Sequence, residues 1–241
     1  MENQKLTFIR KVTLWAFCAV QFVVWILLIF VKKIPNPHVL SYAATLFCLA
    51  VTLFFCRKQT DWALLAAAFL FTCIADFFLV LLMGEQKTLA MCAFLCAQIC
   101  YAWRTLLFAK TAKERWLNVV LRLVLSALAA VAVVAVLREK AEPLFVISLV
   151  YYANLILSIV FSFAHFKDGI VPKLTAIGLL CFSLCDITIG FDFLINIFSL
   201  SQGNLIYEIV HLPVSLVTVF YPPSQAILCT SAYPFSINQT K

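Results

Sequence analysis

Charged side chains are scarce in this sequence. Asp, Glu, Lys and Arg make up 12% of the 241 residues, and 64% of the residues are apolar, whereas a soluble domain carries about 25% charged residues. So few charges cannot cover a water-exposed surface. Glycine and proline are also few, at five and eight, which excludes a Gly/Pro-rich fibre, and no run alternates with the period of two that is typical of a membrane β-barrel. We therefore expect an all-α, polytopic integral membrane helix bundle.

The apolar residues fall into stretches of membrane-spanning length. About 20 residues of helix cross the roughly 30 Å hydrocarbon core, so the chain holds about eight spans in a single transmembrane domain, with no soluble domain of any size. The first span follows basic residues as a secretory signal would, but its apolar part is too long for one and has no small-residue cleavage site. The predicted spans are residues 12–31, 39–56, 62–83, 88–109, 116–137, 144–163, 172–191 and 213–233.

The longest predicted connection runs from residue 192 to residue 212. We expect Glu208 and His211 there, in a loop or an interfacial segment at the mouth of the bundle. The other connections are short.

Two further absences limit the ligands. The ten cysteines include no CxxC pair, and Cys92, Cys96 and Cys100 form a helix stripe without a nearby histidine, so we expect no metal and no cofactor. The net charge of +7 is spread over the ends of apolar runs and forms no patch, which argues against a nucleic-acid partner. Membrane lipids are the expected surroundings, and the sequence carries no indication of oligomeric state.

Two carboxylates interrupt the apolar runs. Asp76 and Asp186 lie inside predicted spans, where a charged side chain costs about 2.5–3.5 kcal/mol and is expected to face the bundle interior. Each follows the start of its span by about fourteen residues, or some 20 Å of helix. A four-plus-four duplication of the chain would place them so, although chance similarity between apolar helices is an alternative. The structural alternative for the acids is an ion pair with Arg104 or Arg122, but we expect these to snorkel towards the nearer helix ends.

Polar side chains on other predicted spans could complete a site around the acids. Residues three or four apart share a helix face, and such pairs occur in the fourth and the last span. Any one pair is more often helix-packing contact than a site, but together with two acids they predict a polar cavity. The candidate residues are Gln98, Tyr101, Tyr152, Asn154, Ser183, Tyr221 and Gln225.

The order of these motifs resembles a known family. The motifs are the apolar run that ends in Asp76, the segment 94–101 (FLCAQICY), the segment 182–186 (FSLCD) and the segment 221–228 (YPPSQAIL). Together they resemble the YhhN family of eight-span membrane proteins, which includes the vertebrate lysoplasmalogenases. The sequence departs from the family pattern at three places, with Ala75 for Gly, Gln98 for His and Cys185 for Ser. A glutamine cannot exchange protons near neutral pH as a histidine can, so proton donation from position 98 is lost.

The resemblance implies hydrolysis of the vinyl ether bond of a lysoplasmalogen, a lysophospholipid, to a fatty aldehyde and a glycerophospho head group. Asp76 and Asp186 would then be the catalytic acid–base pair, and the polar candidates would bind the substrate. The chemistry fits two buried carboxyl groups, because a proton must reach carbon and water must add to an oxocarbenium-like centre, much as in glycosidases.

Two other classes of function compete with the hydrolase. The first is a proton-coupled carrier of a lipid or small amphiphile, which would move its substrate without producing aldehyde. The second is a sensor or structural partner protein, which so short an extramembrane part serves poorly.

The distribution of basic residues predicts the orientation. Eleven Lys and Arg outside the spans lie on the side of the two termini and five lie on the other side, so the positive-inside bias places both termini in the cytoplasm. We expect a multi-pass protein of the cell membrane. Reporter fusions at Lys241 and in the loop around Glu85 should give opposite signals, and equal signals would contradict eight spans.

Overall fold

The structure is a computed structural model that describes residues 2–31, 36–55, 61–82, 86–138 and 141–233. These residues form helices and connections and contain no strand, as the composition predicts. The Glu85 loop and Lys241 lie outside them. The elements are α1 Glu2–Phe30, α2 Pro37–Phe55, α3 Trp62–Asp76, η1 Phe77–Leu81, α4 Lys87–Leu106, α5 Ala112–Leu137, α6 Pro143–Ala164, η3 Phe166–Asp168, α7 Ile170–Phe198, α8 Leu205–Val210 and α9 Leu216–Thr230.

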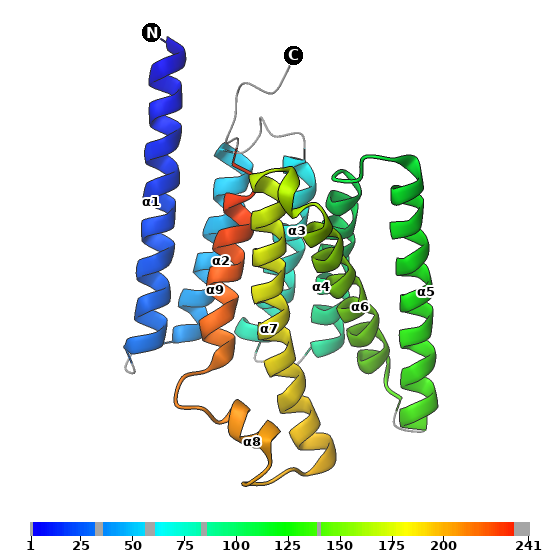
Figure 1. Cartoon of the computed structure of the whole chain (residues 1–241). Helices are drawn as coiled ribbons and strands as arrows, with labels where there is room; N and C mark the ends of the chain where they lie inside the picture. The colour runs from blue at the N-terminus through cyan, green and yellow to red at the C-terminus, as the bar shows by residue number, and fades with distance from the viewer. Residues whose placement is uncertain (1, 32–35, 56–60, 83–85, 139–140, 234–241) are drawn as a thin grey trace.

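The long helices traverse the bundle alternately in opposite directions (Figure 1). Within the described residues, seven segments are long and apolar enough to cross a membrane, one of them formed by α3 and η1 together. The last predicted span is shorter than expected, because α9 has 15 residues, or about 22 Å of helix. It nevertheless packs against α1, α2 and α7 and brings the chain back to the end where α1 begins (Figure 1). The protein is a polytopic helix bundle.

Several boundaries differ from the predicted ones, among them the end of α7 and the start of α5. Helix α7 continues to Phe198, so the first part of the predicted 192–212 connection is helical. The helix ends there because Ser199 adopts a left-handed conformation with φ of 51°. Glu208 lies in the short helix α8 and His211 directly follows it. Helix α5 begins at Ala112, because the Thr111 hydroxyl accepts a hydrogen bond from the Glu114 amide at 3.1 Å and caps the helix start.

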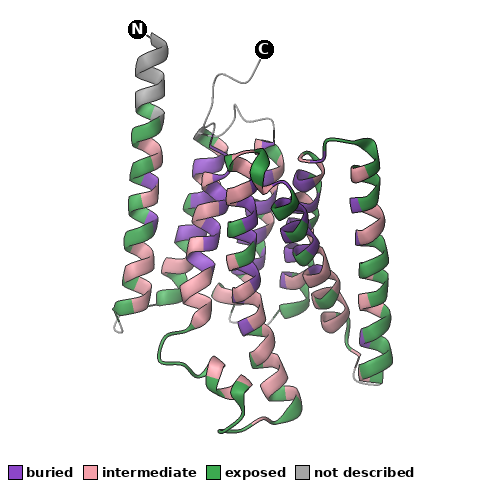
Figure 2. Cartoon of the chain, viewed as in Figure 1, coloured by how far each residue is buried: buried purple, intermediate pink, exposed green. Residues whose placement is uncertain are grey.

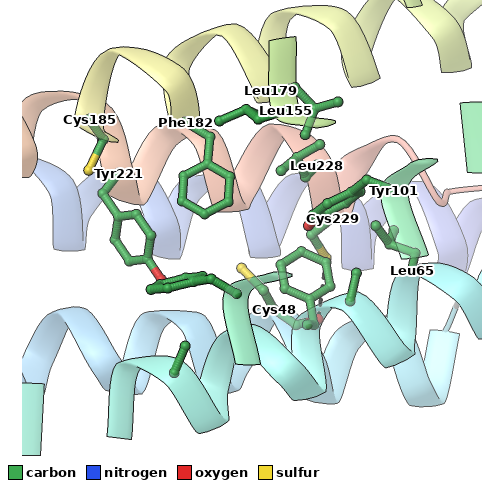
Figure 3. Close-up of a cluster of buried hydrophobic side chains, with 14 of the residues drawn as sticks. Cys48, Leu65, Tyr101, Leu155, Leu179, Phe182, Cys185, Tyr221, Leu228 and Cys229 are labelled. Atoms are coloured by element: carbon green, nitrogen blue, oxygen red, sulfur yellow. Dashed lines mark hydrogen bonds between the residues drawn. The ribbon is translucent and has the colours of Figure 1, made fainter. Parts of the chain in front are cut away.

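The burial pattern separates a lipid-facing rim from a packed centre (Figure 2). Helices α1 and α5 expose most of their apolar residues, whereas α3, α4 and α7 carry many of the buried ones. Among the fully buried side chains are Leu65, Phe69, Leu155, Phe182 and Leu228 (Figure 3). Polar side chains in this centre can be satisfied only by the protein.

Two irregular segments interrupt the helices beside this centre. The α3 helix passes directly after Asp76 into a π-helical turn, in which the Leu82 amide bonds the Phe77 carbonyl at 3.1 Å. Such turns are rare and frequent at functional sites. In α9, Pro223 has no N–H to give the Val219 carbonyl one turn earlier. The indole N–H of Trp25 on α1 donates to that carbonyl at 3.1 Å instead, so the first helix replaces the missing hydrogen bond.

Replacing Trp25 by phenylalanine should therefore destabilise the protein. The Trp25→Phe variant keeps an aromatic ring but removes the N–H, and we expect a loss of about 0.5–1.5 kcal/mol, the net contribution of a typical hydrogen bond. Thermal unfolding in detergent would measure it. Trp15→Phe is the matched control, because Trp15 lies on the same helix and is 75% exposed. Equal unfolding midpoints for the two variants would contradict this role.

Candidate active site

Asp76 is held by a tyrosine of the last helix. It is the final residue of α3 and is 4% exposed, and the Tyr221 hydroxyl of α9 donates a hydrogen bond to its Oδ2. Thr45 of α2 also lies near this carboxyl group, although its hydroxyl donates to the Ser41 carbonyl at 3.3 Å. The residue after Tyr221 begins the Pro222–Pro223 segment of α9, so the irregular part of the helix adjoins the contact with the acid.

Asp186 is held in the same way by a tyrosine of another helix. The Tyr151 hydroxyl of α6 donates to Oδ2 of Asp186 on α7. Tyr151 is buried and Asp186 is partly exposed. The two carboxyl groups lie within electrostatic range of each other, and Cys185 lies within range of both.

A layer of aromatic rings connects the two tyrosine–aspartate pairs. Ring centroids are 6.0 Å apart for Tyr151 and Phe94, 5.9 Å for Phe94 and Phe182, and 5.7 Å for Phe182 and Tyr221. Figure 3 shows Phe182 and Tyr221 facing each other in the core. The acids therefore belong to one centre built from α3, α4, α6, α7 and α9.

The two acids lie at similar distances from the starts of their helices. Helices α3 and α7 run in the same direction (Figure 1). Asp76 lies fourteen residues after Trp62 and Asp186 sixteen after Ile170, which corresponds to about 21 and 24 Å of helix. The duplication of the two halves stays a prediction.

Most of the other predicted residues lie close to these pairs. Tyr152 follows Tyr151 and Ser183 precedes Asp186 by three residues, and the hydroxyl oxygens of Tyr152 and Ser183 are 3.1 Å apart. Gln98 lies next to the Tyr151 hydroxyl, although its amide makes no well-formed hydrogen bond. Tyr101 and Gln225 are buried on the same helices as Gln98 and Tyr221, one turn further along.

Asn154 is engaged elsewhere. Its side-chain amide donates to the Ser126 hydroxyl at 2.9 Å, and its backbone carbonyl oxygen accepts from Arg122 at 3.0 Å. Arg122 also donates to Thr105 at 3.0 Å and to Ser158 at 3.1 Å. The structure therefore places Asn154 in a network that joins α4, α5 and α6 and gives it no contact with either acid.

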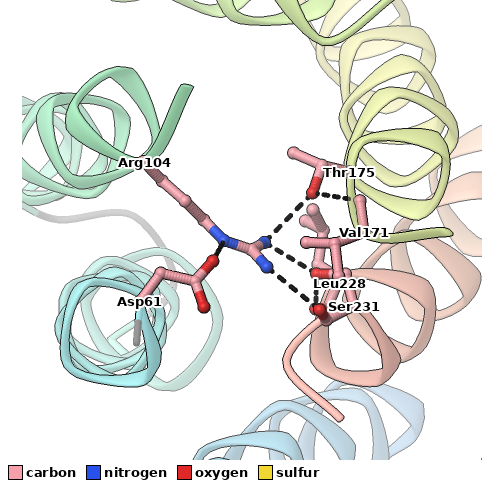
Figure 4. A network of polar contacts seen from close by, with 6 residues as sticks. All are labelled: Asp61, Arg104, Val171, Thr175, Leu228 and Ser231. Carbon is pink, nitrogen blue, oxygen red and sulfur yellow. Dashed lines mark hydrogen bonds and ion pairs between the residues drawn. The ribbon is translucent and has the colours of Figure 1, made fainter. Parts of the chain in front are cut away.

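Arg104 is fully buried, contrary to the expected snorkelling (Figure 4). It forms an ion pair with Asp61, which directly precedes α3. It also donates to the Thr175 hydroxyl at 3.1 Å and to the Ser231 hydroxyl at 2.7 Å. Arg122 is buried as well. The expectation fails because each guanidinium finds protein acceptors within reach, and neither arginine contacts Asp76 or Asp186.

Sequence reasoning missed two partners in this region. Tyr151 lies on the polar face that the sequence predicts for its helix, with Asn154 and Ser158, but sequence spacing did not show that it, and not Tyr152, reaches Asp186. Asp61 lies at the end of a predicted connection, where an acidic residue is ordinary, so no signal marked it as the partner of Arg104.

The one groove described between helices is not part of the acid centre. It encloses about 380 Å³ between α1 and α9, and its walls include Phe22, Trp25, Pro222 and Pro223. Neither acid lines it. Among the described residues, no three His, Cys, Asp or Glu side chains gather in a cluster that could hold a metal ion.

The fold and this centre define the class: a polytopic helical membrane protein with two carboxyl groups paired inside the bundle. The chain belongs to the YhhN family, whose sequence model matches residues 37–207. The match covers Asp76, Gln98, Tyr151 and Asp186 but ends before Tyr221. No curated protein and no solved structure shows a significant match.

The buried ion pair yields a stability prediction. Arg104→Met leaves Asp61 as an unpaired buried charge, which should cost about 3–5 kcal/mol, whereas Arg104→Met combined with Asp61→Asn should recover much of that loss. Lys110→Met is the control, because it breaks an exposed pair with Asp168 worth at most about 1 kcal/mol. Thermal unfolding in detergent compares the three variants, and a double variant as unstable as the single one would contradict the pairing.

Proposed function

We propose that this protein is a membrane-embedded hydrolase of the vinyl ether bond in lysoplasmalogen-like lysophospholipids. One observation carries the proposal: two carboxyl groups, each held by a tyrosine hydroxyl, lie within electrostatic range of each other inside the bundle. Family membership supports it, because the family includes lysoplasmalogenases.

The reaction uses the two acids in opposite protonation states. The protonated acid delivers its proton to the outer carbon of the C=C–O group, which leaves an oxocarbenium ion. The ionised acid stabilises this cation. It also takes a proton from the water that adds to the oxocarbenium carbon. The resulting hemiacetal breaks its C–O bond to release a fatty aldehyde and the glycerophospho alcohol. In this step the hydroxyl proton of the hemiacetal is replaced by a proton on the departing glycerol oxygen, and the proton taken from water passes from the second acid back to the first, so that one water is consumed and the acid pair is restored.

Like charges at short range favour this division of roles. Two neighbouring carboxylates in a site of low dielectric constant disfavour double ionisation, so one proton is shared between them. Each tyrosine hydroxyl donates to one carboxyl oxygen and thereby fixes the orientation of the carboxyl group. The π-helical turn after Asp76 and the double proline after Tyr221 give this pair a local backbone that differs from a regular helix.

We also propose a cell-membrane location with both termini in the cytoplasm. The beginning of α1 and the last turn of α9 lie at the same end of the bundle (Figure 1). Basic residues are concentrated at that end, among them Lys110, Lys113, Arg115 and Lys167.

Conversion of either acid to asparagine should abolish aldehyde release. Asp76→Asn and Asp186→Asn each remove the acid–base function, which typically contributes about 10²- to 10⁴-fold, while a neutral amide costs less to bury than a charge. Both variants should therefore stay folded and inserted. Release of fatty aldehyde from lysoplasmalogen by the purified protein in detergent is the measurement. Asp192→Asn is the control, because Asp192 is exposed on the same helix as Asp186.

Two outcomes would refute the assignment. Wild-type turnover in both asparagine variants would make the acids structural. Movement of lipid across vesicle membranes by the wild type without aldehyde formation would favour the proton-coupled carrier instead.

A further inference from the structure

Helices α4 and α9 run in the same direction and keep a fixed register across the centre of the bundle. Arg104 of α4 donates to Ser231, which directly follows α9 and lies 127 positions later, at 2.7 Å. One layer deeper, Phe94 and Tyr221, also 127 positions apart, both contact the ring of Phe182. Helices of equal rise per residue stay level between two such points. Residues between them that differ by 127 therefore lie at similar depths.

Gln98 and Gln225 are the glutamines that this register pairs. Gln98 is 0% exposed and Gln225 is 2% exposed. Both amide atoms of Gln98 and the carbonyl oxygen of Gln225 make no hydrogen bond within the described structure. The Gln225 nitrogen donates only to the neighbouring Ser224 hydroxyl, at 3.2 Å. Buried polar atoms without partners are rare in native proteins, and each calls for a ligand, a water or a functional role.

Gln98 and Gln225 lie one helical turn from residues of the acid centre. Four residues separate Gln98 from Phe94 and Gln225 from Tyr221, which is about 6 Å along each helix. Gln98 lies beside the Tyr151 hydroxyl that holds Asp186. The Tyr101 hydroxyl, one turn further, is also buried without a partner.

We propose that Gln98 and Gln225 together bind a neutral hydroxyl group beside the two acids; the inference rests on the proposed hydrolase function. Two amides offer both donors and acceptors, as a hydroxyl group requires, and they carry no charge. A phosphate would need a free cation, but the nearest guanidinium on α4, that of Arg104, is engaged by Asp61, Thr175 and Ser231. The hydroxyl group belongs either to the glycerol of the lysophospholipid or to the water that hydrolysis consumes.

The test compares two substrates and three variants of the full chain in detergent. The substrates are a lysoplasmalogen and its analogue without the glycerol hydroxyl. The variants are Gln98→Met, Gln225→Met and the double variant, because methionine keeps the length of the side chain and removes its polar atoms. A shared ligand makes the two substitutions non-additive, so the double variant should lose no more activity than either single one. Ser162→Ala is the control, because Ser162 is another buried, unpartnered polar residue, on α6.

The two sources of the hydroxyl give different results. If the substrate supplies it, kcat/KM of each variant should fall about 10- to 100-fold with the lysoplasmalogen, and the analogue should be equally poor with wild type and variants. If water supplies it, kcat should fall for both substrates alike and the missing hydroxyl should have no effect. Unchanged kinetics in both variants, or losses that simply multiply, would overturn the proposal.

A binding measurement keeps this test separate from the reaction. A 1-O-alkyl lysophospholipid has no vinyl ether bond, so its stabilisation of the protein against heat needs no turnover. If the wild type releases no aldehyde, the hydrolase assignment fails. The glutamine site still stands if this ligand raises Tm more than its form without the hydroxyl does, and if the methionine variants abolish that difference. Without turnover, equal shifts for both ligands would overturn it.

Discussion

Hydrocarbon offers no hydrogen bonds, and this constraint governs the whole structure. A polar group inside the bundle must find its partner in the protein. The guanidinium of Arg104 does so through Asp61, Thr175 and Ser231, which ties α4 to α7, α9 and the start of α3. Arg122 does so through α4, α5 and α6. The helix arrangement thus follows from polar contacts as much as from apolar packing, since lipid tails are as apolar as leucine.

The two arginine networks and the acid centre occupy different positions along the bundle. In both networks the guanidinium nitrogens all donate hydrogen bonds, which suits a structural role. The centre combines two held carboxyl groups, a π-helical turn, a double proline and glutamine atoms without partners. Departures from regular helix structure gather there, as expected where function and not stability determines the residues.

The sequence predicted the parts of this structure that depend on composition and on isolated polar residues. The helical class, the traversing segments and the inward position of Asp76, Asp186 and Tyr221 follow from what a bilayer excludes. Contacts between helices could not be predicted, since spacing along one helix does not give its rotation relative to the others. For that reason Tyr152 and Asn154 were singled out, while Tyr151 is the residue that reaches Asp186. The pairing of Arg104 with Asp61 was missed because it joins a span to the end of a connection.

The hydrogen bond from Trp25 to Val219 has a consequence for how the chain is divided. The family match begins at residue 37, after α1, so by homology alone the first helix looks like a removable anchor. Yet the Trp25 indole of α1 donates to the Val219 carbonyl, which Pro223 cannot bond. Val219 lies two residues before Tyr221. The homologous segment alone therefore lacks a hydrogen bond that the full chain makes at this carbonyl. Studies of isolated fragments should begin at the N-terminus of α1, because a shorter chain leaves a bare carbonyl in the hydrocarbon beside the residue that holds Asp76.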